Sequence, residues 1–538
     1  MANLCSAKLL KVFVLLLLLL LLNSLLVLPA RILVALAPDN KSHLRSMLPL
    51  INRLASSSHS VHVFSFSSEK IEEKFAPNVA LITVPTELNR ENIMKEMGER
   101  IWKQTMHSPM MAFVYKIFAQ SFEVLLQKHS DKVAEVLNSS WDLLVIGELF
   151  SVHAYAFALF LSDHRHVPYA VFSPAMMMHS NAFKNALGHS WVTHPHPFSP
   201  ILRHSDDRFQ PQLFSSRLFN VLESLGEMLT WPFVDAFVIA PKIALLTGRN
   251  DFSFDQLYHR SEIALVDSID LLAFPQPSAN DVLSAGAHCE VPTELPKDYR
   301  VFVEDPHSKG TVYVAFGTAV PWDYAPPHIA NAFFDAFERL SDHRFIFSFR
   351  GTFPNRTLSP HIRLVSWAPQ LEVLSHPKTK VFLTHSGLKS IKESLCSGTP
   401  MLTMPMFAEQ AHNAKMLLEF GIGIGLSKFS IDAQTLFDGL SEVSAANVRP
   451  SLLHKPKYAQ RALKLRHIFL DRPMNALDEA NFRLSQIIRR RSNGSKGKGE
   501  KRREFVGRKG TEKGATESFH LDWTFILLAV ITFLFLDK

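Results

Sequence analysis

Short apolar runs alternate with amphipathic stretches along the first half of the chain. Residues 31–38 (RILVALAP) and 61–66 (VHVFSF) have the length and the Val, Ile and Phe content of strands. The stretch between them, residues 41–58, predicts an amphipathic helix because its apolar residues recur at intervals of three and four. These residues are Leu44, Met47, Leu48, Ile51 and Leu54.

The alternation continues through two more apolar runs, residues 142–147 and 168–174, which flank a helical stretch at 151–163. Alternation of strand, helix and strand predicts a parallel sheet covered by helices on both faces. A proline-containing segment, residues 275–310, then interrupts the pattern. We therefore expect a first α/β domain over residues 31–274.

The second half repeats this arrangement. Its strand-like runs lie at 311–317, 345–349, 362–367, 380–385 and 401–405. With a helix expected at 326–340 and others between the later strands, we predict a second α/β domain over residues 275–455. A returning helix is expected at 456–490. Two such domains place a cleft at their junction, and ligands bind open α/β sheets at the carboxyl ends of the strands.

Both ends of the chain predict a membrane-directed protein. Residues 1–30 have the basic flank, Leu-rich run and small final residue of a signal peptide, with an uncleaved anchor as the alternative. Residues 521–537 predict one short transmembrane helix; a lipid-anchor signal or an interfacial helix are the alternatives. The basic linker at 491–520, expected to be disordered, favours a cytosolic side. We give precedence to the signal peptide, which places the domains in the lumen. N-glycosylation sequons begin at Asn40, Asn138, Asn355 and Asn493.

The net charge of +7 on the 538-residue chain is concentrated near its end. Residues 489–517 contain eleven Lys and Arg against four Asp and Glu, a surplus of seven. The rest of the chain is close to neutral, which argues against a nucleic-acid-binding face.

Cysteine usage excludes two classes of protein. Of the three cysteines, Cys5 lies in the predicted signal peptide, which leaves Cys289 and Cys396. Two are too few for a disulfide framework or a cysteine metal site. We expect two free buried thiols in preference to a single bridge.

Candidate chemistry follows two strands of the second domain. Residues 381–383 run directly into His385 and Gly387, and a helix is expected to begin near residue 388. The N–H groups and the dipole at the start of a helix favour a phosphate. A second such turn contains Gly317 and Thr318. Two phosphate-binding turns in one domain would suit a diphosphate, although an ordinary strand–turn–helix has the same pattern.

Two shorter motifs are rejected. Ser386 and Lys389 have the Ser-x-x-Lys spacing of penicillin-binding enzymes, but the companion Ser-Asp-Asn and Lys-Thr-Gly elements are missing. Residues 421–425 (GIGIG) resemble a dinucleotide-binding loop, yet they follow a predicted helix and lack the required spacing.

The longer pattern over residues 367–410 resembles the signature of the UDP-glycosyltransferases, the family that includes the UDP-glucuronosyltransferases. Its elements are Trp367, Pro369, Gln370, His376, Thr384, His385, Gly387, Ser390, Glu393, Gly398, Pro400, Pro405 and Gln410. The resemblance implies the GT-B architecture, in which two Rossmann-like domains face a cleft. It also implies a signal peptide and a C-terminal membrane anchor.

The resemblance assigns roles on the donor side. Trp367 would stack on uracil and Gln370 would pair with its edge. Glu393 would bind both ribose hydroxyls. His385, Gly387 and Thr318 would hold the diphosphate, so that no metal is required. Glu409 and Gln410 would bind hydroxyls of the donor sugar.

The acceptor side is expected in the first domain. His43 would be the catalytic base that takes a proton from an acceptor hydroxyl, with inversion at the anomeric carbon. His59 and His62 are interpreted as structural. The apolar stretches 109–118 and 174–179 are compatible with a greasy acceptor pocket, although Met-rich runs are also common in cores.

The sequence departs from the family pattern at both sides. The family's orienting Asp corresponds to Gly147, and Glu148 is expected to replace it. In the donor loop Ser386 and Lys389 replace a Gly and an Asn, and Glu409 replaces an Asp.

We predict a UDP-glucuronosyltransferase-like enzyme of the endoplasmic reticulum membrane, single-pass and with lumenal domains. It would transfer glucuronic acid or glucose from UDP to a hydroxyl of a small lipophilic acceptor. A weakened or inactive UDP-sugar-binding protein of the same fold is the alternative. A homo-oligomer is possible, and no nucleic acid partner is expected.

Overall fold

The computed structural model describes residues 29–39, 41–68, 71, 73–88, 90–177, 194–269, 272–274, 279–353, 355–445 and 458–493. The predicted signal peptide (apart from its last two residues), most of the linker and the C-terminal transmembrane helix lie outside these residues. Asn138 and Asn355, two of the sequon asparagines, are exposed.

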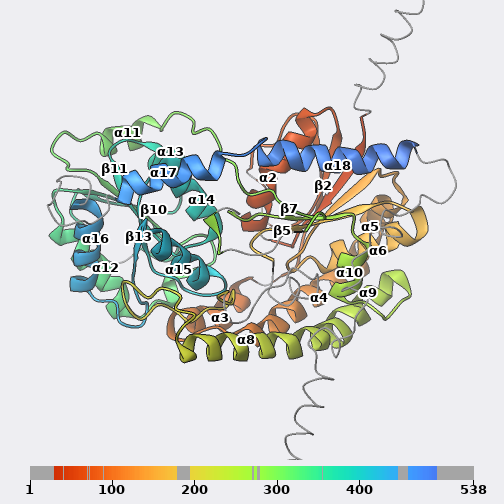
Figure 1. The fold of residues 1–538 in the computed structure, drawn as a ribbon, viewed down its shortest axis with the longest axis horizontal. Helices are drawn as coiled ribbons and strands as arrows, with labels where there is room; N and C mark the ends of the chain where they lie inside the picture. The colour runs from red at the N-terminus through yellow and green to blue at the C-terminus, as the bar shows by residue number, and fades with distance from the viewer. Residues whose placement is uncertain are drawn as a thin grey trace, which may run out of the picture.

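The chain forms two parallel sheets, each between layers of helices (Figure 1). The first sheet has the order β3-β2-β1-β4-β5-β6-β7. Its strands are β1 (Arg31–Ala35), β2 (Ser60–Phe66), β3 (Val79–Val84), β4 (Leu143–Gly147), β5 (Tyr169–Ser173), β6 (Ile263–Val266) and β7 (Val282–Ser284). Its helical elements are α2 (Lys41–Ser56), α3 (Arg90–Lys103), η1 (Ser108–Met110), α4 (Met111–Lys128), α5 (Ser130–Asn138), α6 (Val152–Arg165), α8 (Phe214–Phe233), η2 (Val234–Ile239), α9 (Ala240–Thr247) and α10 (Phe254–Arg260).

The second sheet has the order β10-β9-β8-β11-β12-β13. Its strands are β8 (Thr311–Ala315), β9 (Arg344–Ser348), β10 (Ile362–Val365), β11 (Thr379–Thr384), β12 (Met401–Thr403) and β13 (Gly423–Gly425). The helical elements are α11 (Lys297–Val303), η4 (Trp322–Tyr324), α12 (Pro327–Arg339), α13 (Gln370–Ser375), α14 (Leu388–Ser397), α15 (Gln410–Phe420), α16 (Ala433–Ala445), α17 (Tyr458–Leu470) and α18 (Ala476–Asn493). The two predicted α/β sheets are therefore confirmed.

The apolar spacing that predicted α2 holds with one correction. Leu44, Met47, Ile51 and Leu54 are buried as expected, but Leu48 is only half-buried and Leu50 is buried in its place. The buried stripe is therefore displaced around the helix from the predicted one, and it also includes Ala55. This face fixes α2, and hence His43 in its first turn, against the first sheet.

Two segments cross between the halves. The C-terminal helix α18 lies along α2 (Figure 1), where Ser485 bonds His59 at 3.2 Å and Leu484 is buried. In the other direction, Trp102 at the end of α3 is buried in the core of the second domain and donates to the carbonyl of Pro321 at 2.9 Å. Both contacts restrain how far the two sheets can separate.

The expectation of two free thiols is wrong, because Cys289 and Cys396 form a disulfide. The bond joins the segment between the domains to the last turn of α14. Residues 421–425, which lack the spacing of a dinucleotide-binding loop, follow α15 and contain the edge strand β13.

Candidate active site

The loop between β11 and α14 holds the imidazole of His385 against two glycines. A side chain at Gly317, in the turn after β8, would place its Cβ 2.6 Å from His385 Nε2, and one at Gly387 would come equally close. Gly317 also has a left-handed φ of 69°, which glycine adopts without strain. The ring therefore lies where the ends of two neighbouring strands meet the start of α14.

His385 is a neutral hydrogen-bonding group in this position. Burial lowers the pKa of its imidazole to about 4, so at pH 7 the ring has one N–H donor and one acceptor nitrogen. Its Nδ1 lies 3.4 Å from the hydroxyl of Thr384, and Thr318 follows Gly317 in the adjacent turn. Together with the N–H groups at the start of α14, these residues form a site suited to an anion.

Ser386 adopts a conformation that usually requires glycine. Its φ is 66°, a region that costs an L-residue about 1–2 kcal/mol. Its carbonyl accepts a bond from Asn413 Nδ2 at 3.1 Å, which ties the loop to α15. Its hydroxyl is buried and has no hydrogen-bond partner among the described residues, so a polar group is available beside His385.

Gln370 and Glu393 are brought together from two helices. The Gln370 amide donates to the Glu393 carboxylate and, at 3.3 Å, to Ser390, while Tyr313 donates to its oxygen at 3.2 Å. Burial raises the pKa of Glu393, partly opposed by Lys389. The two residues expected at the base and the ribose are therefore neighbours.

The ammonium group of Lys389, in the first turn of α14, lies between two carboxylates. It lies 3.1 Å from Glu290 and 3.7 Å from Glu393. Burial opposes the charge, but these two carboxylates outweigh it and raise the pKa of Lys389. The residue that replaces the family's Asn thus joins α14 to the segment that carries the disulfide.

Trp367 follows β10 and is 48% exposed. Tyr299 fixes its backbone by donating to its carbonyl at 3.0 Å. The guanidinium of Arg45, from α2 of the first domain, lies 4.2 Å from the centre of the ring, and that of Arg350 lies 5.7 Å away. One aromatic face is thus in a cation–π contact across the domain junction, and a base that stacked on that face would displace Arg45.

Glu409 and Gln410 lie at the start of α15. Burial raises the pKa of Glu409, opposed by its own backbone N–H. The Gln410 oxygen accepts from the backbone N–H groups of Met406, at 3.0 Å, and Phe407, at 3.2 Å. Its oxygen therefore shapes the preceding loop, and the amide nitrogen is the end that can reach a ligand.

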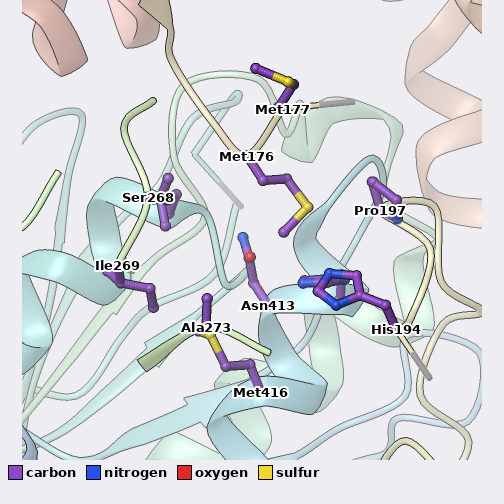
Figure 2. A pocket seen from close by; sticks show the side chains of 11 residues that line it. Met176, Met177, His194, Pro197, Ser268, Ile269, Ala273, Asn413 and Met416 are labelled. Atoms are coloured by element: carbon purple, nitrogen blue, oxygen red, sulfur yellow. The ribbon is translucent and has the colours of Figure 1, made fainter. Parts of the chain in front are cut away.

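A pocket between the domains opens beside the start of α14, where Leu388 is one of its lining residues (Figure 2). Its space, including the part that is open to solvent, is about 510 Å³, and its lining includes Met176 and Met177 after β5, Ile269 after β6, and Met416 of α15. Asn413, whose amide holds the Ser386 carbonyl, lies in the middle of the view. The pocket joins an apolar lining from the first domain to the donor loop of the second.

His43 is the third residue of α2 and stacks on Phe150, with 5.8 Å between ring centres. Burial lowers the pKa of its imidazole to about 3, so the ring is neutral at pH 7 and is a weaker base than a free imidazole. Ser46, one turn further along α2, donates to the carbonyl of Pro174 at 3.4 Å. This bond places α2 next to the segment that contributes Met176 to the pocket.

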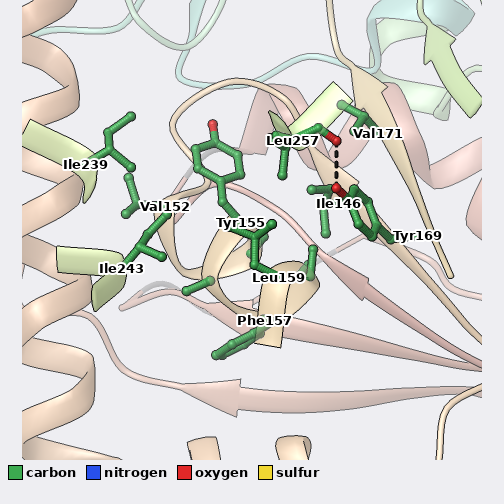
Figure 3. Close-up of a cluster of buried hydrophobic side chains, with 14 of the residues drawn as sticks. Ile146, Val152, Tyr155, Phe157, Leu159, Tyr169, Val171, Ile239, Ile243 and Leu257 are labelled. Atoms are coloured by element: carbon green, nitrogen blue, oxygen red, sulfur yellow. Dashed lines mark hydrogen bonds between the residues drawn. The ribbon is translucent and has the colours of Figure 1, made fainter. Parts of the chain in front are cut away.

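Gly147 is the last residue of β4 and Glu148 follows it, in a buried part of the core where Tyr169 donates to the Leu257 carbonyl at 2.6 Å (Figure 3). A Cβ at Gly147 would lie 2.8 Å from Ser151 Oγ and 3.2 Å from Leu36, on the β1 side. The Glu148 carboxylate instead accepts from Ser173 on the β5 side.

Glu148 therefore does not occupy the space of the missing Asp. Consecutive residues of a strand point to opposite faces, and the carboxylate also adds to burial in raising the pKa of Tyr258. Its role as the partner of His43 stays a prediction.

The sequence did not indicate the residues that join helix α14 to the first domain. Lys392 of α14 and Asp267, which follows β6, form a buried ion pair of 2.5 Å. The sequence also did not indicate Arg45, which reaches Trp367 from the first domain, and two further contacts around α14, Glu290 with Lys389 and Asn413 with Ser386. These contacts join residues 27 to more than 300 positions apart, and no short motif marks them.

Comparison with known proteins agrees with this geometry. Residues 30–497 match the family model described as UDP-glucoronosyl and UDP-glucosyl transferase. The chain is 25% identical over 470 residues to UDP-glucuronosyltransferase 2B17 of Rattus norvegicus, covering 84% of this chain and 83% of the relative. It is 26% identical over 465 residues to UDP-glucuronosyltransferase 1A7 of the same species, with coverage of 84% and 82%.

Solved structures show the same fold. The glycotransferase of kitacinnamycin superposes with a TM-score of 0.56 at 18% identity, covering 85% of this chain and 99% of its own. TcCGT1 in complex with UDP superposes with a TM-score of 0.53 at 15% identity, covering 85% and 100%. The two facing α/β domains are thus those of the GT-B glycosyltransferases. With a family model that spans most of its length, the chain belongs to the UDP-glucuronosyl and UDP-glucosyl transferases, a family of glycosyltransferases.

Proposed function

We propose that this protein transfers a sugar, glucuronic acid or glucose, from UDP to a hydroxyl of a small lipophilic acceptor. The observation that carries the proposal is the position of His385 between Gly317 and Gly387 at the start of α14. The adjoining Gln370–Glu393 pair supports it. The curated relatives include UDP-glucuronosyltransferases, which favours glucuronic acid as the sugar.

The donor would lie along the ends of the strands of the second sheet. Uracil would stack on Trp367 and pair with Gln370, and the Glu393 carboxylate would accept from the ribose hydroxyls. This requires the Gln370 amide to turn from Glu393 toward the base. The diphosphate would take the N–H groups of α14, the His385 N–H and the hydroxyls of Thr318 and Ser386.

Glu409 and the Gln410 amide nitrogen would bind hydroxyls of the sugar. This assignment rests on their place at the start of α15, next to the loop that Gln410 caps.

The reaction would proceed by a single displacement. His43 takes the proton of the acceptor hydroxyl as that oxygen forms a bond to the anomeric carbon. The bond between this carbon and the diphosphate oxygen breaks, UDP leaves with the electron pair, and the anomeric configuration inverts. Since burial holds the pKa of His43 at about 3, its basicity would depend on groups that approach in the complex.

The acceptor would occupy the pocket lined by Met176, Met177 and Met416. Thioether side chains adapt to apolar ligands of different shape. We further propose that the protein acts at the endoplasmic reticulum membrane with its domains in the lumen, held by the segment at 521–537. The Cys289–Cys396 disulfide is in keeping with an oxidising compartment.

The proposal is tested by a turnover assay with UDP-glucuronate and UDP-glucose against a panel of phenols. We expect UDP release coupled to a glycosylated phenol, lowered by about 10²–10⁴-fold in a His43→Ala variant. The alternative, a donor-binding protein with little catalysis, is favoured by Gly147 and by the contacts of Glu148. Saturable donor binding without product, and without any effect of His43→Ala, would establish that alternative.

A further inference from the structure

The helical segment formed by α8, η2 and α9 buries its acidic side chains and exposes a row of large apolar ones. All three of its acidic residues, Glu223, Glu227 and Asp235, are on the side that faces the protein, and each is no more than 6% exposed. A surface helix normally turns its apolar stripe to the core and its charges to water. In α8 the buried face is mainly polar, whereas the buried residues of η2 and α9 are mainly apolar.

Each buried acid has partners within the protein. Glu223 accepts from the backbone N–H and hydroxyl of Ser108, at 3.1 and 2.9 Å, and also bonds His107. Glu227 bonds His196 at 2.8 Å and Trp231 at 3.0 Å. These hydrogen bonds replace the water that the carboxylates lose, so the orientation of the helix is fixed by specific contacts.

The outer face is a continuous apolar stripe. Its exposed residues are Phe214, Leu218, Leu222, Leu225, Leu229, Phe233, Phe237 and Leu245. At a rise of about 1.5 Å per residue the stripe extends for about 45 Å. Both basic residues of the segment bond elsewhere, Arg217 to the carbonyl of Pro211 and Lys242 to Glu123. Figure 1 shows α8 along the lower edge of the molecule, with no other described element outside it.

We propose that this stripe, residues 214–245, docks on the surface of a lipid bilayer. Contiguous exposed apolar faces of this length mark interaction sites, and a Phe- and Leu-rich helix face enters the boundary between headgroups and acyl chains.

A bilayer is the occupant that the rest of the chain favours. The apolar run 523–536 follows the last described residue, Asn493, by a linker of 29 residues, 494–522. Such a linker spans at most about 100 Å, so an anchor at 521–537 would keep the stripe near a membrane. The stripe would then fix the orientation of the two domains on that surface.

Residues Leu229 and Phe237 are each 72% exposed and provide sites for a probe. Val301, which is 67% exposed on α11 at the opposite edge in Figure 1, is the matched control. Each is replaced by Cys in the full chain with Cys5→Ser, since Cys289 and Cys396 are paired. The variants carry an environment-sensitive nitrobenzoxadiazole label and are reconstituted in phosphatidylcholine vesicles, with or without nitroxide-labelled lipid.

We expect nitroxide lipid to quench the labels at 229 and 237 and to leave the label at 301 bright. Equal behaviour of the three labels would overturn the proposal. Labels at 229 and 237 that resist lipid quenching but lose emission when the total protein concentration is lowered would indicate a second copy as the occupant, and would also overturn the proposal. A thermal unfolding midpoint equal to that of the parent chain confirms that each labelled variant is folded. None of these readouts depends on the sugar or acceptor.

Discussion

The donor side and the acceptor side of the cleft are built in different ways. On the donor side, residues 367–410 supply most of the contacts, and Gln370, Glu393 and His385 already have defined neighbours. On the acceptor side, His43 stacks on Phe150, while Gly147 and Glu148 leave the family's orienting carboxylate without a direct counterpart. If the protein binds a UDP-sugar as proposed, the nucleotide would meet side-chain pairs that already exist, whereas the catalytic base would complete its surroundings only with the acceptor in place.

The largest expected effect is on the acceptor side. His43→Ala should lower kcat/KM by about 10²–10⁴-fold, because a positioned general base contributes that much, and should leave donor affinity unchanged. Turnover and calorimetric binding of the donor measure the two quantities separately. His62→Ala is the matched control, since His62 is a half-buried residue of β2 that packs against Trp141. Full turnover in His43→Ala would remove His43 from the mechanism.

On the donor side, removing the disulfide should have the largest effect on stability. The bond closes a sequence separation of 107 residues, and such a cross-link is worth about 2–4 kcal/mol. The double variant Cys289→Ser/Cys396→Ser should lose that much free energy of unfolding, measured by urea titration under oxidising conditions. The parent chain treated with reductant is the control. Two reactive thiols in the folded, non-reduced parent would contradict the assignment.

Glu393→Ala should weaken donor binding by about 10- to 100-fold. Hydrogen bonds to a charged group contribute about 1.5–3 kcal/mol, and about 1.4 kcal/mol corresponds to a factor of ten. Glu290→Ala is the matched control, because it removes the other carboxylate partner of Lys389 and is not expected to touch the ribose. Equal affinity losses in the two variants would show that Glu393 acts only through Lys389.

Stability should fall as the pH drops from about 6.5 towards 4. Burial lowers the pKa of His385 to about 4 and that of His153 to about 3, while both titrate near 6.5 when unfolded. In this pH window the unfolded chain binds more protons than the folded chain. Each imidazole therefore lowers the free energy of unfolding by up to about 1.4 kcal/mol for each pH unit. His153→Phe should flatten the curve of unfolding free energy against pH. An unchanged slope would mean that His153 is protonated in the folded protein.

The smallest expected effect is that of Ser386→Gly. Relief of the left-handed φ of 66° should raise the free energy of unfolding by about 1 kcal/mol, since this region costs an L-residue about 1–2 kcal/mol. Thermal unfolding measures it. Ser386→Ala keeps the strain and removes only the buried hydroxyl, so it separates the two causes. A stability for Ser386→Gly at or below that of Ser386→Ala would show that the loop is not strained.

The comparison also shows what the sequence could predict. Both α/β domains followed from the alternation of apolar runs with helical spacing, because buried strands and amphipathic helices leave local patterns. The short or edge strands β3, β7 and β13 have weaker patterns, and the sequence pattern predicts none of them.

Contacts between distant residues could not be predicted in this way. The Cys289–Cys396 bond and the Lys392–Asp267 pair depend on how α14 meets the residues that follow β7 and β6, respectively. No pattern in the sequence indicates that Glu290 lies beside Lys389. The orientation of Glu148 was equally hidden, because one position along a strand decides which face a side chain takes.

The most direct test of the donor site is a calorimetric titration of UDP-glucuronate and of UDP-glucose into the purified full chain. We predict saturable one-to-one binding of at least one of the two, weakened in Glu393→Ala. Absence of binding by both sugars, in a chain that unfolds cooperatively, would contradict a UDP-sugar site at the start of α14.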